Sequence, residues 1–235
     1  MINEHNIPAF EELVGHEFDR KSLLFQAITD SSYFQGWDTP VSDDYGTLEL
    51  LGDAILRVAV VDYFSTCRLP EGWGVSKRRI EGLAQSNEFL YGVAKEIMLD
   101  DFWRIREEVV SRWPEGRQRK LPANMMEAII AAIYRDRNFE EACRFVDRHI
   151  NSRIERLFEF PRDDWMYNLR SLLPEEKQDL LRIEEITQTM NGQDNGSTTW
   201  QVFFEDQALS RVTGKDSEMA QDSAAFISLV FFMKT

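Results

Sequence analysis

Apolar residues in the first two thirds of the chain recur at the spacing of amphipathic helices. This spacing runs through residues 10–14, 23–28, 48–64, 87–99 and 124–134. A last helix is predicted over residues 140–154, and Pro122 stands where a helix is expected to begin. Breaks are expected at residues 36–39, 70–74 and 113–116, each of which contains glycine or proline. The pattern predicts a continuous helical array from residue 8 to about 152.

The pattern changes after about residue 158. Alternating apolar and polar positions predict strands at residues 183–189, 198–204 and 208–212, with a turn-rich loop after the first. Helical spacing returns at residues 165–173 and 217–231. The predicted fold class is therefore mainly α. An all-helical domain over residues 1–158 precedes a small α+β domain of order α-β-β-β-α over residues 159–235.

Composition narrows the class of protein. Hydrophobic residues make up 43% and charged residues 29% of the chain, which is ordinary for a globular protein in water. No apolar run reaches the roughly 18 residues of a membrane span, and the start lacks the features of a secretory signal. Only Cys67 and Cys143 are present, which favours a reducing compartment over a disulfide framework. An intracellular protein without a membrane partner is expected; cytoplasm, nucleus and organelle stay open.

Two carboxylates interrupt the apolar run at residues 47–56. Glu49 and Asp53 are four residues apart and therefore share one helical face. Because charged side chains are rarely buried without a partner, the pair predicts a bound cation, and oxygen ligands suit Mg²⁺. A solvated acidic stripe on an ordinary amphipathic helix is the alternative.

The run Leu48-Glu49-Leu50-Leu51-Gly52-Asp53-Ala54-Ile55-Leu56 resembles the signature helix of the ribonuclease III family. Four further stretches follow in the order of that family: residues 10–29, 30–33, 70–79 and 124–134. The resemblance covers residues 8 to about 152. The remainder is similar to a double-stranded-RNA-binding domain in its order of elements.

This resemblance implies cleavage of double-stranded RNA by a metal held between acids of two helices. Its metal ligands correspond to Glu49, Asp53, Asn124 and Glu127, among which Asp53 and Glu127 would be catalytic. The implied cofactor is Mg²⁺, which Mn²⁺ could replace. Glu71 matches a further acid of the family.

The sequence departs from the family pattern at three positions. Asn124 replaces an aspartate, so it offers an oxygen without a charge. Losing one charge at close range weakens cation binding by about a few kcal/mol, so Mg²⁺ binding is expected to be weakened. Gly46 stands where another glutamate is usual, and Asp30 replaces a histidine.

The charge distribution gives a mixed prediction for RNA binding. The net charge is −14, although phosphate contacts require Lys and Arg. Two basic strips near the acidic helices are candidates, with solvated basic faces as the alternative: Lys77, Arg78, Arg79; and Arg117, Arg119, Lys120. Residues 161–235 carry 13 acidic and 7 basic side chains. Ser217 and Glu218 stand where such RNA-binding domains place two lysines, so this domain is expected to have lost much RNA affinity and to serve protein contacts.

Two functions remain open from the sequence. One is an active metal-dependent endoribonuclease acting on double-stranded or structured RNA. The other is a catalytically impaired member that acts as a dimeric scaffold for RNA or a ribonucleoprotein. In both, the resemblance implies a homodimer or heterodimer through the helical domain, and the apolar helix at residues 48–64 suits such an interface.

Overall fold

The computed structural model describes residues 6–34, 44–67, 77–160, 164–186 and 197–232. These residues form two compact units. One comprises the described residues up to 67 and those from 80 to 152; the other comprises the described residues from 153 on, with residues 77–79. Within these ranges, no helix is both long and apolar enough to cross a membrane. The predicted domain boundary at residue 158 stays a prediction.

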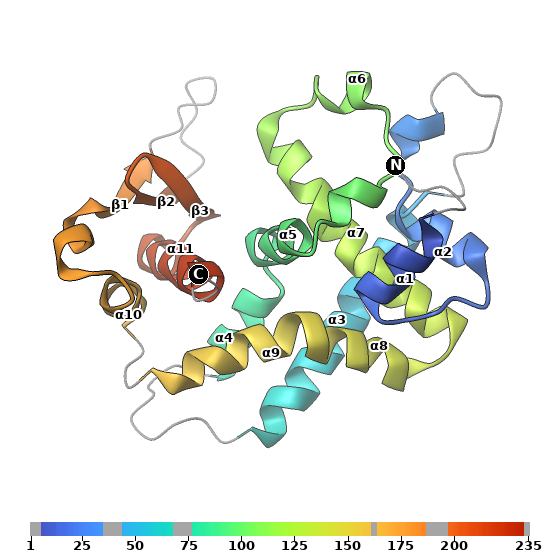
Figure 1. Ribbon diagram of the computed structural model, residues 1–235, viewed down its shortest axis with the longest axis horizontal. Coiled ribbons are helices and arrows are strands. Elements are labelled where there is room, and N and C mark those ends of the chain that lie inside the picture. The colour runs from blue at the N-terminus through green and yellow to red at the C-terminus, as the bar shows by residue number, and fades with distance from the viewer. Residues whose placement is uncertain (1–5, 35–43, 68–76, 161–163, 187–196, 233–235) are drawn as a thin grey trace. The chain divides into compact units, whose positions relative to one another are not determined.

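The first unit is helical, as the apolar spacing predicts (Figure 1). Its α-helices are α1 (Ile7–Val14), α2 (Lys21–Ala27), α3 (Gly46–Thr66), α4 (Lys77–Ala84), α5 (Asn87–Glu96), α6 (Glu107–Val110), α7 (Glu115–Asp136) and α8 (Phe139–Val146). Short 3-10 turns lie at η1 (Ser31–Phe34) and η3 (Leu99–Phe102). A π-helical turn, η4 (Asp147–Asn151), continues α8 into α9 (Ser152–Glu155), so the helix predicted over residues 140–154 contains a π turn.

Local side chains set the ends of these helices. Ser86 and Asn138 are N-caps whose side-chain oxygens accept the backbone N–H of Phe89 and Glu141, at the starts of α5 and α8. Gly15 ends α1 with a φ of 71°, the left-handed conformation that glycine adopts without strain. These caps fix where the chain turns between helices.

Helix α7 is the centre of the helical unit. It packs against α2, α3, α5 and α8, and nearly every residue from Leu121 to Ile133 is buried. Burial of so much apolar surface is the main stabilising contribution to this unit. Asn124 and Glu127 therefore lie on a helix that is fixed by packing against four other helices.

The start of α7 corrects one prediction. The break predicted at residues 113–116 is present at Trp113 and Pro114, between α6 and α7. Pro122 was expected at the beginning of a helix, but α7 begins at Glu115 and Pro122 lies inside it. The N-cap is Pro114, whose carbonyl accepts the N–H of Arg117 at 2.9 Å. A proline costs an interior helix one hydrogen bond, yet the Pro122 side chain is buried against apolar neighbours, which offsets that loss. The basic residues 117–120 are therefore helical.

The second unit confirms the predicted order α-β-β-β-α. Its elements are η5 (Arg156–Glu159), α10 (Trp165–Ser171), η6 (Glu175–Leu180), β1 (Leu181–Ile186), β2 (Thr198–Phe204), β3 (Gln207–Gly214) and α11 (Ser217–Phe232). The strands form an antiparallel sheet of order β1-β2-β3, with Ile183 opposite Val202 and Val202 opposite Ser210. Helix α11 packs on β2, β3 and α10 (Figure 1). Residues 187–189, part of the predicted first strand, lie outside the described residues.

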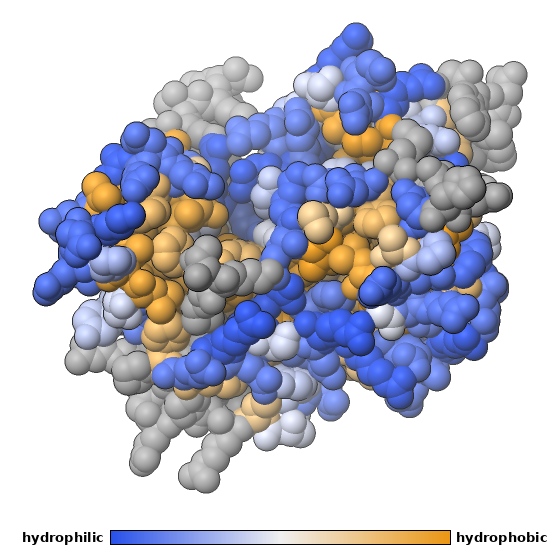
Figure 2. All heavy atoms as spheres, viewed as in Figure 1, coloured by the Kyte–Doolittle hydropathy of each residue, from blue (hydrophilic) through white to orange (hydrophobic). Residues whose placement is uncertain are grey.

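The surface seen in Figure 2 is mostly hydrophilic, with apolar residues showing between polar ones. Among the large apolar side chains of the described residues, Leu50 of α3 has the highest exposed fraction, 78%. Val58 and Val61 on the same helix are 54% and 41% exposed. Three exposed apolar side chains therefore lie along α3, as the sequence-based expectation of an interface on this helix requires.

Candidate active site

Helices α3 and α7 touch at Gly52. A Cβ atom at this position would lie 1.8 Å from the backbone oxygen of Glu127, so only glycine allows the observed approach. Glu49 and Asp53 lie on α3 on either side of this contact. Asn124 and Glu127 are three residues apart on one face of α7. The crossing therefore brings the four predicted ligands to one surface of the helical unit.

Asn124 joins the two helices through its side chain. It forms hydrogen bonds with the Glu49 carboxylate and with the Tyr45 hydroxyl. Burial raises the pKa of Glu49, as do Asp44 and Asp53, while the Asn124 hydrogen bond and the Lys120 ammonium oppose that rise. Glu49 is thus held by α7 rather than free in solvent.

Glu127 is the most perturbed acid of the surface. Its side chain is only 7% exposed. Burial, and then the charges of Asp53 and Glu49, raise the pKa of Glu127 to about 8. At neutral pH this carboxyl group accordingly keeps a proton unless a cation replaces it.

Asp53 faces solvent at the edge of the same surface. Its carboxylate lies 3.9 Å from the guanidinium of Arg57, one helical turn further on, and the side chains of Asp53 and Arg57 are 43% and 62% exposed. An exposed ion pair at this distance is screened by water and stabilises little. Asp53 therefore remains available to a cation or a phosphate.

The donor chemistry of this surface fits a hard cation, because three carboxylates meet and one of them is desolvated. The four side chains do not, however, form a closed ligand set. Among the residues that the structure describes, no three or more His, Cys, Asp or Glu side chains are grouped as a metal site. The magnesium site predicted from the sequence stays a prediction.

Two residues that sequence reasoning missed belong to this surface. Tyr45 bonds Asn124, and burial, followed by the charges of Asp30 and Glu49, raises the pKa of Tyr45. Asp44 accepts the N–H of Gly46 at 3.0 Å, which closes the turn into α3. A signal existed for Tyr45, since it stands four residues before Glu49 and extends the same helical stripe.

The other three positions compared with the family pattern are Gly46, Asp30 and Glu71. Gly46 is the first residue of α3 and brings no side chain to the acids. Asp30 is 3% exposed and its carboxylate accepts the N–H of Ser32 at 2.8 Å, so it closes a buried turn. Glu71 lies outside the described residues.

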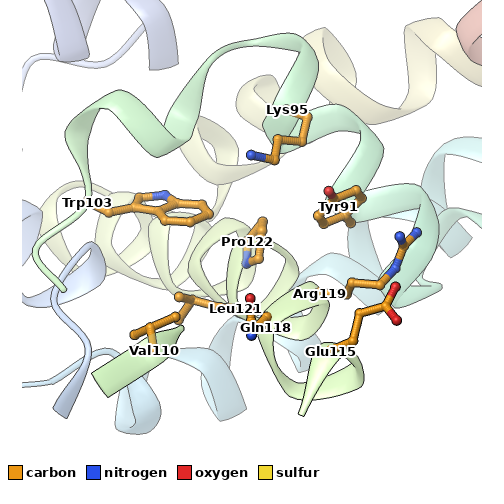
Figure 3. A pocket seen from close by; sticks show the side chains of 9 residues that line it. All are labelled: Tyr91, Lys95, Trp103, Val110, Glu115, Gln118, Arg119, Leu121 and Pro122. Atoms are coloured by element: carbon orange, nitrogen blue, oxygen red, sulfur yellow. The ribbon is translucent and has the colours of Figure 1, made fainter. Parts of the chain in front are cut away.

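The predicted basic strips separate in the structure. The charge of Lys120 opposes the rise that burial causes in the pKa of Glu49. Arg117 lies over the Trp113 ring at 3.7 Å, and Arg119 lies over the Tyr91 ring at 4.8 Å. Arg119 lines a cavity of about 300 Å³, in which Trp103 and Tyr91 lie on opposite sides of Pro122 (Figure 3). The RNA-binding role of Arg117, Arg119 and Lys120 stays a prediction. The other predicted strip, Lys77, Arg78 and Arg79, is in α4, but those side chains lie outside the described part of the chain.

The start of α11 lacks a basic pair. Ser217 accepts the indole N–H of Trp200 at 3.1 Å, and Glu218 is exposed in the first turn. Asp216 accepts the N–H of Met219 at 3.0 Å. Acidic side chains at this helix start would repel a phosphate.

Comparisons with known proteins bear on the helical unit and on the whole chain. A family model described as ribonuclease-III-like matches residues 20–154. The chain is 30% identical to a protein named ribonuclease 3 from Carboxydothermus hydrogenoformans, over 95% of this chain and 94% of that protein. A ribonuclease 3 from Listeria innocua is 26% identical over 92% of this chain and 93% of its own length. Among solved structures, the nuclease domain of ribonuclease III from Campylobacter jejuni is 26% identical with a TM-score of 0.51, covering 63% of this chain and 97% of that chain.

Proposed function

The chain belongs to the ribonuclease III family, and on that basis we propose that it is an endoribonuclease that hydrolyses phosphodiester bonds of double-stranded RNA with Mg²⁺. The observation that carries this proposal is the meeting of Glu49, Asp53 and Glu127 where α3 and α7 touch at Gly52. The near full-length similarity to proteins named ribonuclease 3 supports it.

The residues at the acidic surface would have different roles in the reaction. When bound, Mg²⁺ or Mn²⁺ would activate a water molecule and stabilise the charge that develops on the scissile phosphate. Asp53 and Glu127 would hold the ion: Asp53 is half-exposed, and the buried Glu127 would give up its proton when the ion binds. Asn124 orients Glu49 through its hydrogen bond. Lys120 is exposed and carries a positive charge beside Glu49, where a phosphate of the substrate could approach.

We infer that two copies, or this chain and a related one, pair through the exposed apolar side chains of α3. Leu50, Val58 and Val61 supply that surface. The structure of the nuclease domain of ribonuclease III from Campylobacter jejuni is described as flexible in a region involved in dimer formation, which supports a dimer here. A symmetric pair would present two acidic surfaces to the two strands of a duplex.

A second candidate is a family member that binds RNA or a ribonucleoprotein without cutting it. Asn124 favours this alternative, because it brings no charge to the acidic surface. We also propose that the second unit contacts protein more than RNA, given the acidic start of α11. An intracellular reducing compartment suits Cys67 and Cys143, neither of which is in a disulfide bond.

Cleavage of a long RNA duplex in Mg²⁺ or Mn²⁺ by the wild type, Asp53→Asn and Asn124→Asp separates the candidates. Cleavage by the wild type that disappears in Asp53→Asn is the expected result. Cleavage that appears only in Asn124→Asp would identify a disabled site, and none in any variant would favour the scaffold. Deletion of residues 159–235 that leaves RNA affinity and its salt dependence unchanged would defeat an RNA-binding role for that region.

A further inference from the structure

The cavity beside the start of α7 combines apolar and aromatic walls (Figure 3). Its volume of about 300 Å³ lies at the lower end of the range for small-molecule sites. Three of its lining residues, Val110, Leu121 and Pro122, are buried and apolar. The rings of Trp103 and Tyr91 lie on opposite sides of Pro122. A planar group that enters the cavity would therefore contact aromatic and apolar surface.

Arg119 brings a cation with unused donors to this cavity. Its side chain is half-buried, and its guanidinium lies 4.8 Å from the centre of the Tyr91 ring. Within the described ranges the Arg119 side chain forms no ion pair and no hydrogen bond, and it does not pair with Glu115, which also lines the cavity. A guanidinium presents five N–H donors in a fork that matches a phosphate or a carboxylate. Arg119 is therefore suited to hold an anion in the cavity.

Trp103 and Lys95 add further donors. The indole N–H of Trp103 is buried and has no acceptor in the part of the chain that the structure describes. Such a group lowers stability, and a small turn of the ring toward an acceptor inside the cavity would remove that cost. The Lys95 ammonium lies 5.8 Å from the centre of the same ring, and its ion pair with Asp100 is half-exposed and screened by water. The lining thus holds two cations against one carboxylate, although the chain has a net charge of −14.

Helix α7 separates this cavity from the acidic surface. Successive residues of an α-helix are rotated by about 100°, so the side chains of Pro122 and Asn124 leave α7 about 200° apart. Gln118, one turn before Pro122, also lines the cavity. The charge of Lys120, one turn before Asn124, instead acts on Glu49. A molecule held in the cavity would consequently not touch the acids of α3.

We propose that this cavity binds a nucleoside monophosphate. The base stacks on the rings of Trp103 and Tyr91, because every base has a π-face. The phosphate accepts hydrogen bonds from Arg119, and the charge of Lys95 adds to this attraction. Inorganic phosphate would leave the rings uncovered, and a nucleoside would leave Arg119 without an anion. The inference goes beyond the proposed cleavage of RNA, because the nucleotide does not reach the acidic surface.

Isothermal titration calorimetry of the full-length chain with AMP and with GMP tests the site. EDTA is present, so that no metal ion can bridge the phosphate to the acids. The wild type should bind at least one of the two nucleotides with a Kd below about 1 mM, and the corresponding nucleoside and inorganic phosphate at least about tenfold more weakly. Arg119→Gln should weaken nucleotide binding at least about tenfold, because a charged hydrogen-bond donor is lost. Trp103→Leu should weaken it by about tenfold through lost stacking.

Arg112→Gln is the matched control, since Arg112 is exposed and does not line the cavity; this variant should bind the nucleotide as the wild type does. Asp53→Asn should do so too, and a loss of binding in Asp53→Asn would place the nucleotide at the acidic surface and overturn the inference. It is also overturned if Arg119→Gln binds as tightly as the wild type, if inorganic phosphate binds as tightly as the nucleotides, or if neither nucleotide binds. Far-UV circular dichroism checks that each variant keeps the fold. Cleavage of duplex RNA is measured separately in Mg²⁺, and its outcome bears only on the proposed function.

Discussion

Replacing Gly52 by alanine tests whether the contact between α3 and α7 positions the acids. The added Cβ would lie 1.8 Å from the backbone oxygen, 2.4 Å from the carbonyl carbon and 3.0 Å from the Cα of Glu127. These are backbone atoms of a buried helix and cannot rotate away. Reaching an ordinary contact of about 3.5 Å requires the helices to part by more than about 1 Å.

The expected cost exceeds the gain in helix propensity. Alanine is better than glycine in a helix interior by about 1 kcal/mol, whereas forcing extra volume into a packed core costs about 1–3 kcal/mol and more against fixed backbone. We expect Gly52→Ala to lower the free energy of unfolding by about 2 kcal/mol. Displacing Glu49 and Asp53 from Glu127 by about 1 Å should also reduce cleavage about 100-fold.

Urea unfolding followed by circular dichroism, together with cleavage of duplex RNA, measures both effects. Gly82→Ala is the matched control, since it lies in α4 with no atom within 4 Å of the added Cβ. This control should gain up to about 1 kcal/mol and cleave normally. If Gly52→Ala unfolds at the same urea concentration as the wild type and cleaves as fast, the contact does not position the acids.

Three further changes test other parts of the structure. The pKa of Glu127 is raised to about 8 in the folded, metal-free protein. Its contribution to folding stability is therefore full below the unfolded pKa near 4.5 and is lost as pH rises toward 8. Thermal unfolding should show this loss of stability in the wild type, and Glu127→Gln should not show it. Asp136 accepts the N–H groups of Asp19 and Arg20 at 3.0 and 2.9 Å and a bond from His16. Burial raises the pKa of Asp136, but these hydrogen bonds lower it overall, so the contribution of Asp136 to folding stability is lost only as pH falls below about 4. Urea unfolding should show Asp136→Asn less stable by about 1–3 kcal/mol, and the control Asp206→Asn, at an exposed position, should change stability little. Leu50→Glu should shift sedimentation from dimer to monomer and Met219→Glu should not; a dimer that persists in Leu50→Glu would place the interface elsewhere.

Helical spacing predicted that Glu49 and Asp53 share one face, whereas Asn124 and Glu127 came from the resemblance to the ribonuclease III family. Glu49 and Asp53 are one turn apart on any helix, and so are Asn124 and Glu127. What spacing could not give was the meeting of the two helices, which depends on Gly52 lying against a backbone oxygen 75 residues later in the chain. Contacts of that kind arise from tertiary packing.

The missed features have a similar physical origin. Pro122 favours a helix start in isolation, but burial of the segment around it carries α7 back to Glu115. Arg117 and Arg119 look like one basic strip in the sequence, whereas aromatic rings from different parts of the fold hold each in a different place. Local propensity yields to packing in both cases.

Burial of α7 also separates the architecture of this surface from its charge. Ala123, Met125 and Met126, which flank Asn124 in the sequence, are fully buried, while the Asn124 side chain reaches the surface and is nearly the same size as an aspartate. The backbone position of residue 124 is fixed by the packing of these buried neighbours, which is the same for an amide or an acid side chain. A descendant of this chain could therefore gain or lose a negative charge at the acidic surface by a single substitution while keeping its fold, so that scaffold and nuclease are neighbours in sequence space.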